Sequence, residues 1–242
     1  MKKGDNFGSR MKRYEAASRH YLPTRLPVII RIDGSHFHSY TKGMDKPFDE
    51  DLVQAFWETC KYLASNIMGC KVVYHQSDEI SLLLTNNDKL TSQAWFENNL
   101  QKIVSVSASL ATAKFNEIML SKTGKLATFD SRAWVLPPDE VVNYFLWRQN
   151  DATKNSISMV AQANFSHKEL QGLNSKQLQD KLMLEKGISW NDLPVWKKRG
   201  MCITKQKYYK GEALRNKWDV DHETPIFSRD REYLEQYVFL QG

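Results

Sequence analysis

KVVYHQSDEISLLLT, residues 71–85, contains two short apolar runs on either side of four polar residues. Runs rich in β-branched and other apolar residues favour strands, and a brief polar interruption between two of them is typical of a hairpin. The stretch therefore predicts an antiparallel pair of strands with QSDE at its tip. This hairpin places Asp78 and Glu79 at one end of the predicted sheet.

A second apolar run, LPVIIRID at residues 26–33, predicts a buried strand that Gly34 ends. It carries Asp33 to the same edge of the sheet as Asp78 and Glu79. Three carboxylates at one edge repel one another unless cations neutralise them. Oxygen ligands suit Mg²⁺, and two such ions bridged by carboxylates would activate a hydroxyl and stabilise a leaving oxygen. Gly34 allows a ligand to approach closely, and its carbonyl is a further possible metal ligand.

Periodicity predicts the rest of the chain in outline. A basic helix is expected over 8–22, with Met11, Tyr14 and Ala17 as its buried stripe. Further expectations are an edge segment at 35–40, a loop at 41–49, a helix from the N-cap Asp49 to Gly69, a helix over 93–119, a strand or hairpin over 125–137, a helix from Pro138 and a strand ending the basic segment 196–210.

This order of elements predicts an α+β fold, an antiparallel sheet with helices on one face. We expect a catalytic core over 1–137 and a helical extension over 138–242, which ends in a basic strand segment and packs on the core.

Composition narrows the classes of partner and compartment. Lys and Arg number 34 against 28 Asp and Glu, giving a net charge of +6, which favours a polyanion such as nucleic acid but also occurs in proteins that bind none. Three cysteines without short spacing argue against a disulfide framework and a zinc cluster. Since no apolar run reaches the roughly 18 residues of a membrane helix, and the N-terminus lacks the apolar core of a signal peptide, we expect a cytoplasmic protein.

Four segments occur in an order and spacing that resemble one known family. They are RIDGSHFHSYTKGMDKPFDEDL (31–52), YHQSDEISLLL (74–84), FDSRAWVLP (129–137) and YFLWRQND (144–151). Together they are similar to the tRNA(His) guanylyltransferase superfamily, enzymes that extend RNA in the 3′→5′ direction. The similarity runs from about residue 8 to about residue 206.

The resemblance implies a polymerase-like palm domain and a helical C-terminal part. It implies two Mg²⁺ ions held by Asp33, Asp78 and the Gly34 carbonyl, with Glu79 as a third catalytic acid. The positions that it places near the nucleotide are Gly34, Ser35, His36, Phe37, His38, Lys46, Asp49, Ser77 and Lys102. Without the motifs, Lys46 and Lys102 would be read as solvated surface lysines, and Asp130 and Arg132 are as readily a structural ion pair as catalytic groups.

The expected substrates are tRNA, ATP and GTP, other nucleoside triphosphates remaining possible, and the resemblance implies a homotetramer. Candidate RNA contacts are the basic N-terminal helix, Arg148 and the cluster Lys197, Lys198 and Arg199, with Trp196, Tyr208 and Tyr209 available to stack on bases. The implied reaction begins with 5′-adenylylation of the RNA. Two-metal nucleotidyl transfer from the incoming nucleotide follows.

One segment departs from the pattern of the eukaryotic enzymes. They carry HINNLYN after the WRQ segment, whereas ATKNSIS at 152–158 has Thr153 in the histidine position and keeps Asn155. This favours bacterial or archaeal-type members and template-directed repair of tRNA 5′ ends. Three alternatives stay open: non-templated guanylyl addition to tRNA(His), a palm-type nucleotidyl cyclase and a non-catalytic RNA-binding protein.

Overall fold

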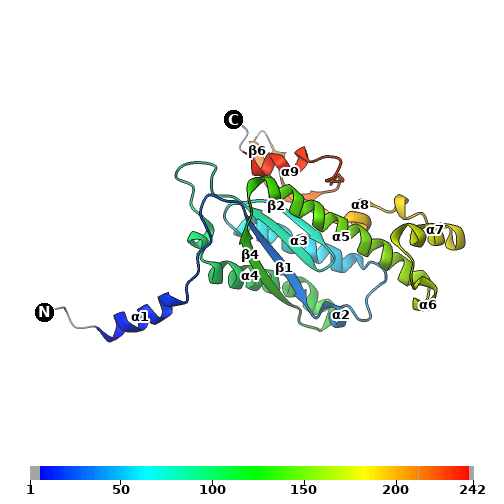
Figure 1. The fold of residues 1–242 in the computed structure, drawn as a ribbon, viewed down its shortest axis with the longest axis horizontal. Helices are drawn as coiled ribbons and strands as arrows, with labels where there is room; N and C mark the ends of the chain where they lie inside the picture. The colour runs from blue at the N-terminus through cyan, green and yellow to red at the C-terminus, as the bar shows by residue number, and fades with distance from the viewer. Residues whose placement is uncertain (1–5, 212, 240–242) are drawn as a thin grey trace.

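The computed structural model describes residues 6–211 and 213–239, which fold around one six-stranded antiparallel sheet (Figure 1). The strands are β1 (Val28–Ser35), β2 (Cys70–Gln76), β3 (Glu79–Leu84), β4 (Thr128–Val135), β5 (Met201–Lys210) and β6 (Ala213–Asp221), in the order β4-β1-β3-β2-β5-β6. The predicted α+β class and the hairpin tipped by QSDE are confirmed. The segment at 125–137 forms one strand rather than a hairpin.

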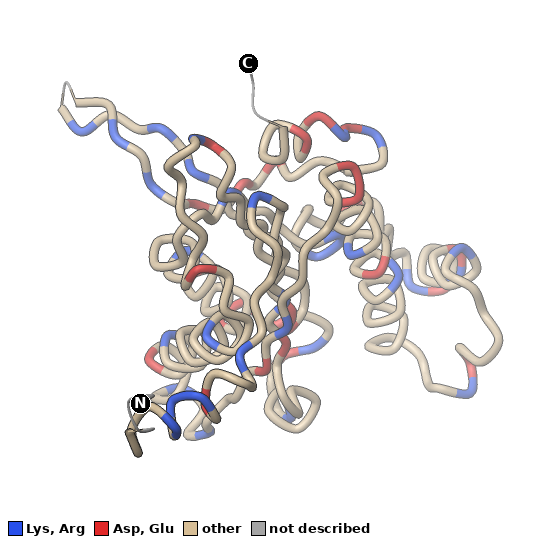
Figure 2. The backbone as a smooth tube through the Cα atoms, turned by 60° about the vertical axis from the view of Figure 1, so that its left-hand side comes forward, with Lys and Arg blue, Asp and Glu red and all other residues tan. Residues whose placement is uncertain are grey.

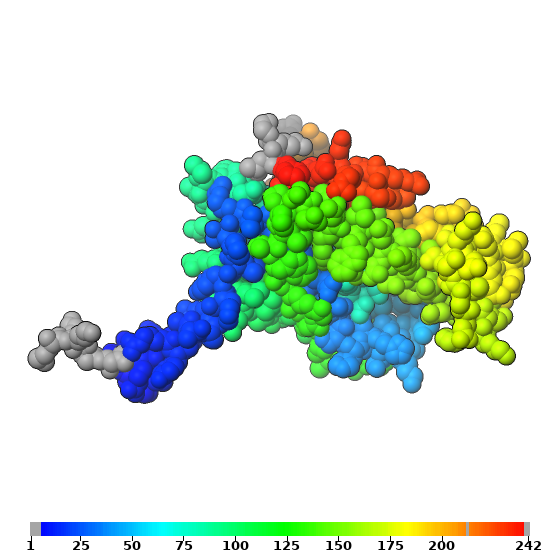
Figure 3. All heavy atoms as spheres, in the orientation of Figure 1, coloured from blue at the N-terminus to red at the C-terminus, as the bar shows by residue number. Residues whose placement is uncertain are grey.

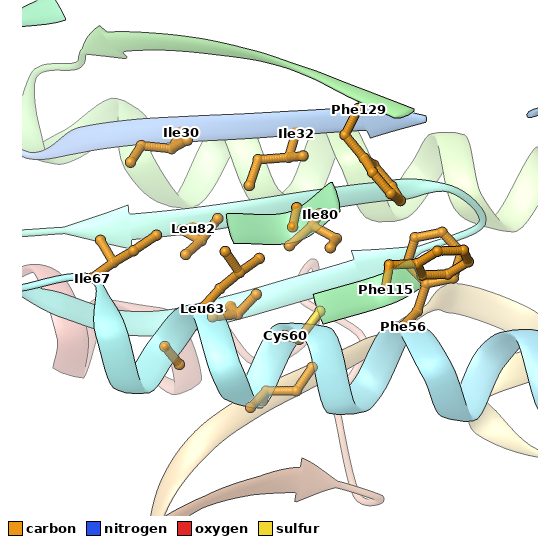
Figure 4. Packing of buried hydrophobic residues seen from close by; sticks show 14 of the residues in the cluster. Ile30, Ile32, Phe56, Cys60, Leu63, Ile67, Ile80, Leu82, Phe115 and Phe129 are labelled. Carbon is orange, nitrogen blue, oxygen red and sulfur yellow. The ribbon is translucent and has the colours of Figure 1, made fainter. Parts of the chain in front are cut away.

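Two helices, α3 (Glu50–Asn66) and α4 (Leu100–Thr123), cover one face of this sheet. Side chains of alternate strand residues, such as Ile30, Ile32 and Leu82, point from the strands into the same cluster as Cys60 and Leu63 of α3 (Figure 4). Asp49 caps α3 as predicted, because its Oδ1 accepts a hydrogen bond of 2.8 Å from the backbone N–H of Leu52.

The opposite face is covered by α5 (Pro138–Asn164) and α9 (Glu232–Val238), whose apolar residues pack on Ile29 and Leu83. The expectation of helices on one face was therefore wrong. The physical signal was present in β1, where consecutive apolar residues (28–30) are typical of a strand buried on both faces.

The segment after residue 164 holds short helices and the last strands. Its helices are α6 (His167–Leu170), α7 (Ser175–Lys186), η2 (Trp190–Asp192), α8 (Val195–Arg199) and α9. The short helix η1 (Trp95–Asn98) precedes α4. Because β5 pairs with β2, the sheet includes strands from both ranges predicted as domains, 1–137 and 138–242. The terminal residues 1–5 and 240–242 of those ranges lie outside the described residues.

Two local predictions differ from the structure. Helix α1 (Phe7–Ala17) projects from the body (Figures 1 and 3), none of its residues is buried, and Phe7 and Tyr14 are 69% and 70% exposed. The predicted buried stripe on this helix is therefore wrong. The edge segment expected at 35–40 contains the short helix α2 (Phe37–Tyr40) instead, because His36 takes a left-handed φ of 57° and turns the chain under the sheet.

No helix in the described part of the chain is long and apolar enough to cross a membrane.

Candidate active site

The acidic residues predicted from sequence converge at the end of the sheet where the β2–β3 hairpin turns. Asp33 is the register partner of Glu79 on β3 and of Asp130 on β4. The backbone N–H of Gly34 donates to the carbonyl of Asp78 at 3.1 Å, so the hairpin tip is bonded to the end of β1. The register thus brings Asp33 and Asp78 together from two separate parts of the chain.

The carboxyl group of Asp78 lies in a partly buried, negatively charged environment. Burial, followed by the charge of Asp33, raises the pKa of Asp78 above its ordinary value. The hydroxyl of Ser77 donates to Asp78 Oδ1 at 3.1 Å. A divalent cation would relieve the repulsion between the two carboxylates, so the pair is suited to hold one.

Glu79 forms a buried ion pair with an arginine of α5. Arg148 on α5 donates through Nε and Nη2 to the two oxygens of Glu79 at 2.7 and 2.6 Å, and the side chains are 7% and 9% exposed. Arg148 also lies 3.2 Å from Asp151. The expectation that Arg148 contacts RNA is therefore wrong, since its guanidinium is buried against Glu79. The charge of the third carboxylate is therefore neutralised by this guanidinium.

Within residues 6–211 and 213–239, no three His, Cys, Asp or Glu side chains form a group that could hold a metal ion by themselves. Asp33 and Asp78 supply two carboxylates, and a cation held there would draw its other ligands from backbone, water or substrate oxygens. This fits Mg²⁺, which usually keeps several waters and binds substrate phosphates.

A cavity of about 540 Å³ opens beside Asp78, between the start of α3, the second half of α5 and α8. The sequence-predicted residues that line it are Phe37, His38, Lys46, Asp49, Ser77, Asp78, Lys197, Lys198 and Arg199. Its walls also include Phe48, Trp57 and Trp196, so it offers apolar surface next to cationic groups. That combination suits the base and phosphates of a nucleotide.

The three basic residues of α8 differ in how they are held. Lys197 lies over the ring of Trp196, with its Nζ 4.8 Å from the ring centroid. The Nζ of Lys198 donates to the carbonyl of Asn191 at 2.5 Å. The buried Nε of Arg199 has no hydrogen-bond partner in the described part of the chain, which leaves a donor unsatisfied at the cavity.

Of the positions predicted to lie near the nucleotide, four lie outside the cavity lining. Gly34 and Ser35 end β1, and His36 is exposed. Lys102 lies in the first turn of α4, with its Nζ 5.8 Å from the centroid of Phe96. The N-cap of α4, Asn99, forms a bridge to Tyr21 before β1, whereas Thr123 at the other end of α4 contacts Tyr40 after β1. Lys102 therefore lies at the end of the sheet away from Asp78, and the structure does not bring it to the cavity of its own chain.

The second half of α5 forms a cavity wall that was not predicted from the sequence. Ala152, Asn155, Ser156 and Met159 all line the cavity. Their spacing of three and four residues places them on one face of a helix, and this periodicity was the available signal. His75 was also missed; burial lowers the pKa of its imidazole to about 4, so the ring is neutral at physiological pH.

Gly34 is required by the packing of Phe37 beneath the end of β1. A Cβ on Gly34 would lie 2.2 Å from Cδ2 of Phe37, whose ring contacts Tyr40, Phe56, Phe115 and Phe129 with centroids 4.9 to 5.7 Å apart. The ring therefore has little room to move.

We expect Gly34→Ala to lower the free energy of unfolding by about 1–3 kcal/mol, because the added methyl group overpacks this aromatic cluster. Urea denaturation measures the change. Gly8→Ala is the matched control, since a Cβ there meets only Asn6 Oδ1 at 3.5 Å in the exposed helix α1. Equal stability of Gly34→Ala and the parent would contradict the packing.

Comparison with known proteins places this site in a family. Residues 8–137, more than half of the 242-residue chain, match the family model described as Thg1, tRNAHis guanylyltransferase. The chain belongs to the tRNAHis guanylyltransferase family. It is therefore a nucleotidyltransferase, as the sequence motifs predicted.

Solved structures of bacterial tRNA(His) guanylyltransferase (Thg1)-like proteins resemble it along nearly its whole length. One, in complex with ATP, is 69% identical with a TM-score of 0.91, and one in complex with GTP is 68% identical with a TM-score of 0.88; each match covers 98% of this chain and 100% of the other. The tRNA(His) guanylyltransferase of Eremothecium gossypii is 28% identical over 77% of this chain and 84% of its own. The tRNAHis guanylyltransferase fold predicted from sequence is confirmed.

Proposed function

We propose that this member of the family repairs tRNA by template-dependent 3′→5′ addition of nucleotides to a shortened 5′ end. The observation that carries the proposal is the pair Asp33 and Asp78 beside a cavity lined by Lys46 and the basic residues of α8. Two carboxylates next to a cationic, partly apolar cavity suit the transfer of a nucleotide, because triphosphate, base and metal each find a matching surface.

Asp33, Asp78 and the Gly34 carbonyl would hold Mg²⁺, with two ions expected for each site. When bound, the metal supplies charge stabilisation for the transferring phosphoryl group and lowers the pKa of the attacking hydroxyl. Lys46 and Arg199 bind phosphate oxygens by charge-assisted hydrogen bonds, and Phe37, His38 and Ser77 contact the rest of the nucleotide. The ATP and GTP complexes of the bacterial Thg1-like proteins support this assignment.

The reaction proceeds in two displacements at phosphorus. An oxygen of the RNA 5′-monophosphate attacks the α-phosphorus of ATP, and pyrophosphate leaves. The 3′-hydroxyl of GTP then attacks the activated 5′ phosphate, and AMP leaves as the new phosphodiester bond forms. An RNA that carries a 5′-triphosphate bypasses the first displacement. The protein contributes orientation and electrostatic stabilisation, since no side chain forms a covalent bond with substrate.

Repair is favoured over histidine-tRNA identity by the segment 152–158. Thr153 occupies the position of the histidine found in eukaryotic enzymes, and Asn155 lies in the cavity wall. Because Asn155 lines the cavity proposed for the nucleotide, it would contact that nucleotide rather than a distant part of the tRNA. The high identity to bacterial Thg1-like proteins also supports this subgroup.

The test compares two 5′-monophosphorylated tRNAs, incubated with Mg²⁺, ATP and labelled GTP. One tRNA lacks its first nucleotide opposite a C, and the other is a full-length histidine tRNA. We expect addition mainly to the truncated tRNA, and addition only when ATP is present. Addition mainly to the full-length histidine tRNA would instead establish non-templated guanylyl addition. A cyclic nucleotide formed from GTP or ATP alone would establish a cyclase.

The β5–β6 hairpin offers a surface for the tRNA backbone. It extends from the sheet with basic residues on both strands (Figure 2), and residues 205–217 contain five basic residues against one acidic residue. Lys205, Lys207, Lys210 and Arg215 are exposed, as is Tyr209. Such a strip of charge suits phosphates, and the proposed homotetramer would combine it with the active site of another subunit.

We expect the triple variant Lys205→Ala, Lys207→Ala, Arg215→Ala to weaken tRNA binding and to lower its salt dependence. Removing one side chain that neutralises a phosphate reduces the slope of log K against log salt by about 0.7–0.9. Filter binding between roughly 50 and 200 mM salt measures this slope. The double variant Lys114→Ala, Lys122→Ala on α4 is the control. Equal salt slopes for the hairpin triple variant and this control would rule out the hairpin as an RNA surface.

A further inference from the structure

The hairpin tip that carries Asp78 has an unfavourable backbone conformation that a buried histidine supports. Ser77 has a φ of 53°, in the left-handed region that residues other than glycine rarely adopt. Ser77 is also exposed, so packing of its own side chain does not fix this conformation. Something else in the structure must hold the turn.

That support comes from His75, two residues earlier on β2. Its Nε2 lies 2.9 Å from the carbonyl oxygen of Ser77, and because a carbonyl only accepts, Nε2 carries the proton and donates. The imidazole is 4% exposed and stacks on Phe56 of α3, with ring centroids 4.8 Å apart and planes 21° apart. The donor is therefore held rigidly by the hydrophobic core.

The backbone at His75 is also restrained by neighbouring strands on both sides. His75 pairs with Ile80 on β3 and with Met201 on β5. Gly200 approaches so closely that a Cβ there would lie 2.5 Å from the His75 carbonyl oxygen. Strands on both sides and a helix beneath therefore fix the ring that holds Ser77.

We propose that His75 is a positioning residue for the active site. Its Nε2–H holds the Ser77 carbonyl, the held turn orients Asp78, and the Asp78 carbonyl accepts the Gly34 N–H that aligns β1 and Asp33. The role assigned to Asp78 rests on the proposed function, whereas the effect on the turn does not.

The test distinguishes the effect of the Nε2–H hydrogen bond from the effect of the aromatic stack. His75→Phe keeps the aromatic stack and removes the N–H, and His75→Gln restores a donor near the Nε2 position. In His75→Phe we expect hydrogen exchange of the Gly34 amide to rise by about tenfold or more, while the Leu82 amide in the middle of β3 changes little. We expect kcat for nucleotide addition to fall by at least about tenfold, with KM for GTP within about threefold. His75→Gln should recover most of both losses.

Leu63→Ala is the matched control for general destabilisation of the same core, because Leu63 is fully buried on α3. It should accelerate exchange at Leu82 and Gly34 alike. Wild-type protection at Gly34 in His75→Phe, or equal acceleration at both amides, would overturn the proposal. If the parent enzyme adds no nucleotide but His75→Phe still shows the selective rise in exchange at Gly34, the proposed function is overturned and the positioning role stays intact.

Discussion

Replacing Asp78 with asparagine is expected to abolish nucleotide addition while leaving the protein at least as stable as the parent in the absence of divalent cations. The change removes a carboxylate ligand and keeps the size of the side chain. Loss of several kcal/mol of electrostatic stabilisation at the transferring phosphate corresponds to a rate lower by about a thousandfold or more.

The stability half of this expectation follows from the raised pKa of Asp78. A carboxyl group whose pKa is higher in the folded protein than in the unfolded chain holds its proton more tightly when folded. Stability therefore falls as pH rises through the ordinary pKa of 3.8 toward the raised value, and the ionised group destabilises the fold at neutral pH. Asparagine removes both the cost of burying this charge and its repulsion with Asp33.

Single-turnover addition to a truncated tRNA and urea denaturation in EDTA measure the two effects. Asp88→Asn is the matched control, because Asp88 is exposed and ion-paired with Lys71 at 2.5 Å beyond the far end of β3. We expect it to leave the addition rate within about twofold of the parent. An Asp78→Asn enzyme that retains the parent's rate would contradict the assignment of Asp78 as a metal ligand.

The second large effect is expected from Arg148→Ala, which should lower the free energy of unfolding by about 3–5 kcal/mol. Removal of the guanidinium leaves Glu79 buried with no charged partner, and a buried unpaired carboxylate is strongly destabilising. Urea denaturation at neutral pH measures the loss.

Two further variants show whether the loss comes from the stranded charge. Arg132→Ala removes an exposed arginine that lies 3.6 Å from Asp130, and we expect it to change stability by less than about 1 kcal/mol. The double variant Arg148→Met, Glu79→Gln removes both buried charges and should recover much of the stability that Arg148→Ala removes. A double variant as unstable as the single would show that packing of the arginine, rather than its charge, is what stabilises α5.

Strands β1 to β3 and the convergence of Asp33 with Asp78 were predictable because their signals are local, whereas β6 was not predicted. A run of apolar, β-branched residues identifies β1, and a polar turn between two such runs identifies the β2–β3 hairpin. A carboxylate in the last residues of a strand lies near one end of the sheet, so the position of Asp33 follows from its place late in β1.

The partner of Glu79 could not be predicted in this way. Arg148 lies 69 residues further along the chain, and the pairing depends on how α5 crosses the sheet. The same limit applies to Lys102, whose motif position does not show at which end of the sheet α4 begins. The alternating pattern at 35–40 resembles a strand, but the left-handed backbone of His36 redirects the chain into α2. Such a turn depends on the space that Phe37 finds beneath the sheet.

The pairing of β5 with β2 also has a consequence for synthesis of the protein. Strands β1 to β4 are complete once residue 135 has left the ribosome, yet the outer edge of β2 stays unpaired until residues 201–203 arrive. An apolar strand with free backbone N–H and C=O groups readily pairs with another chain. Nascent chains stalled between these points would therefore be the most prone to aggregate, and this member of the family would depend most on chaperones during that interval of translation.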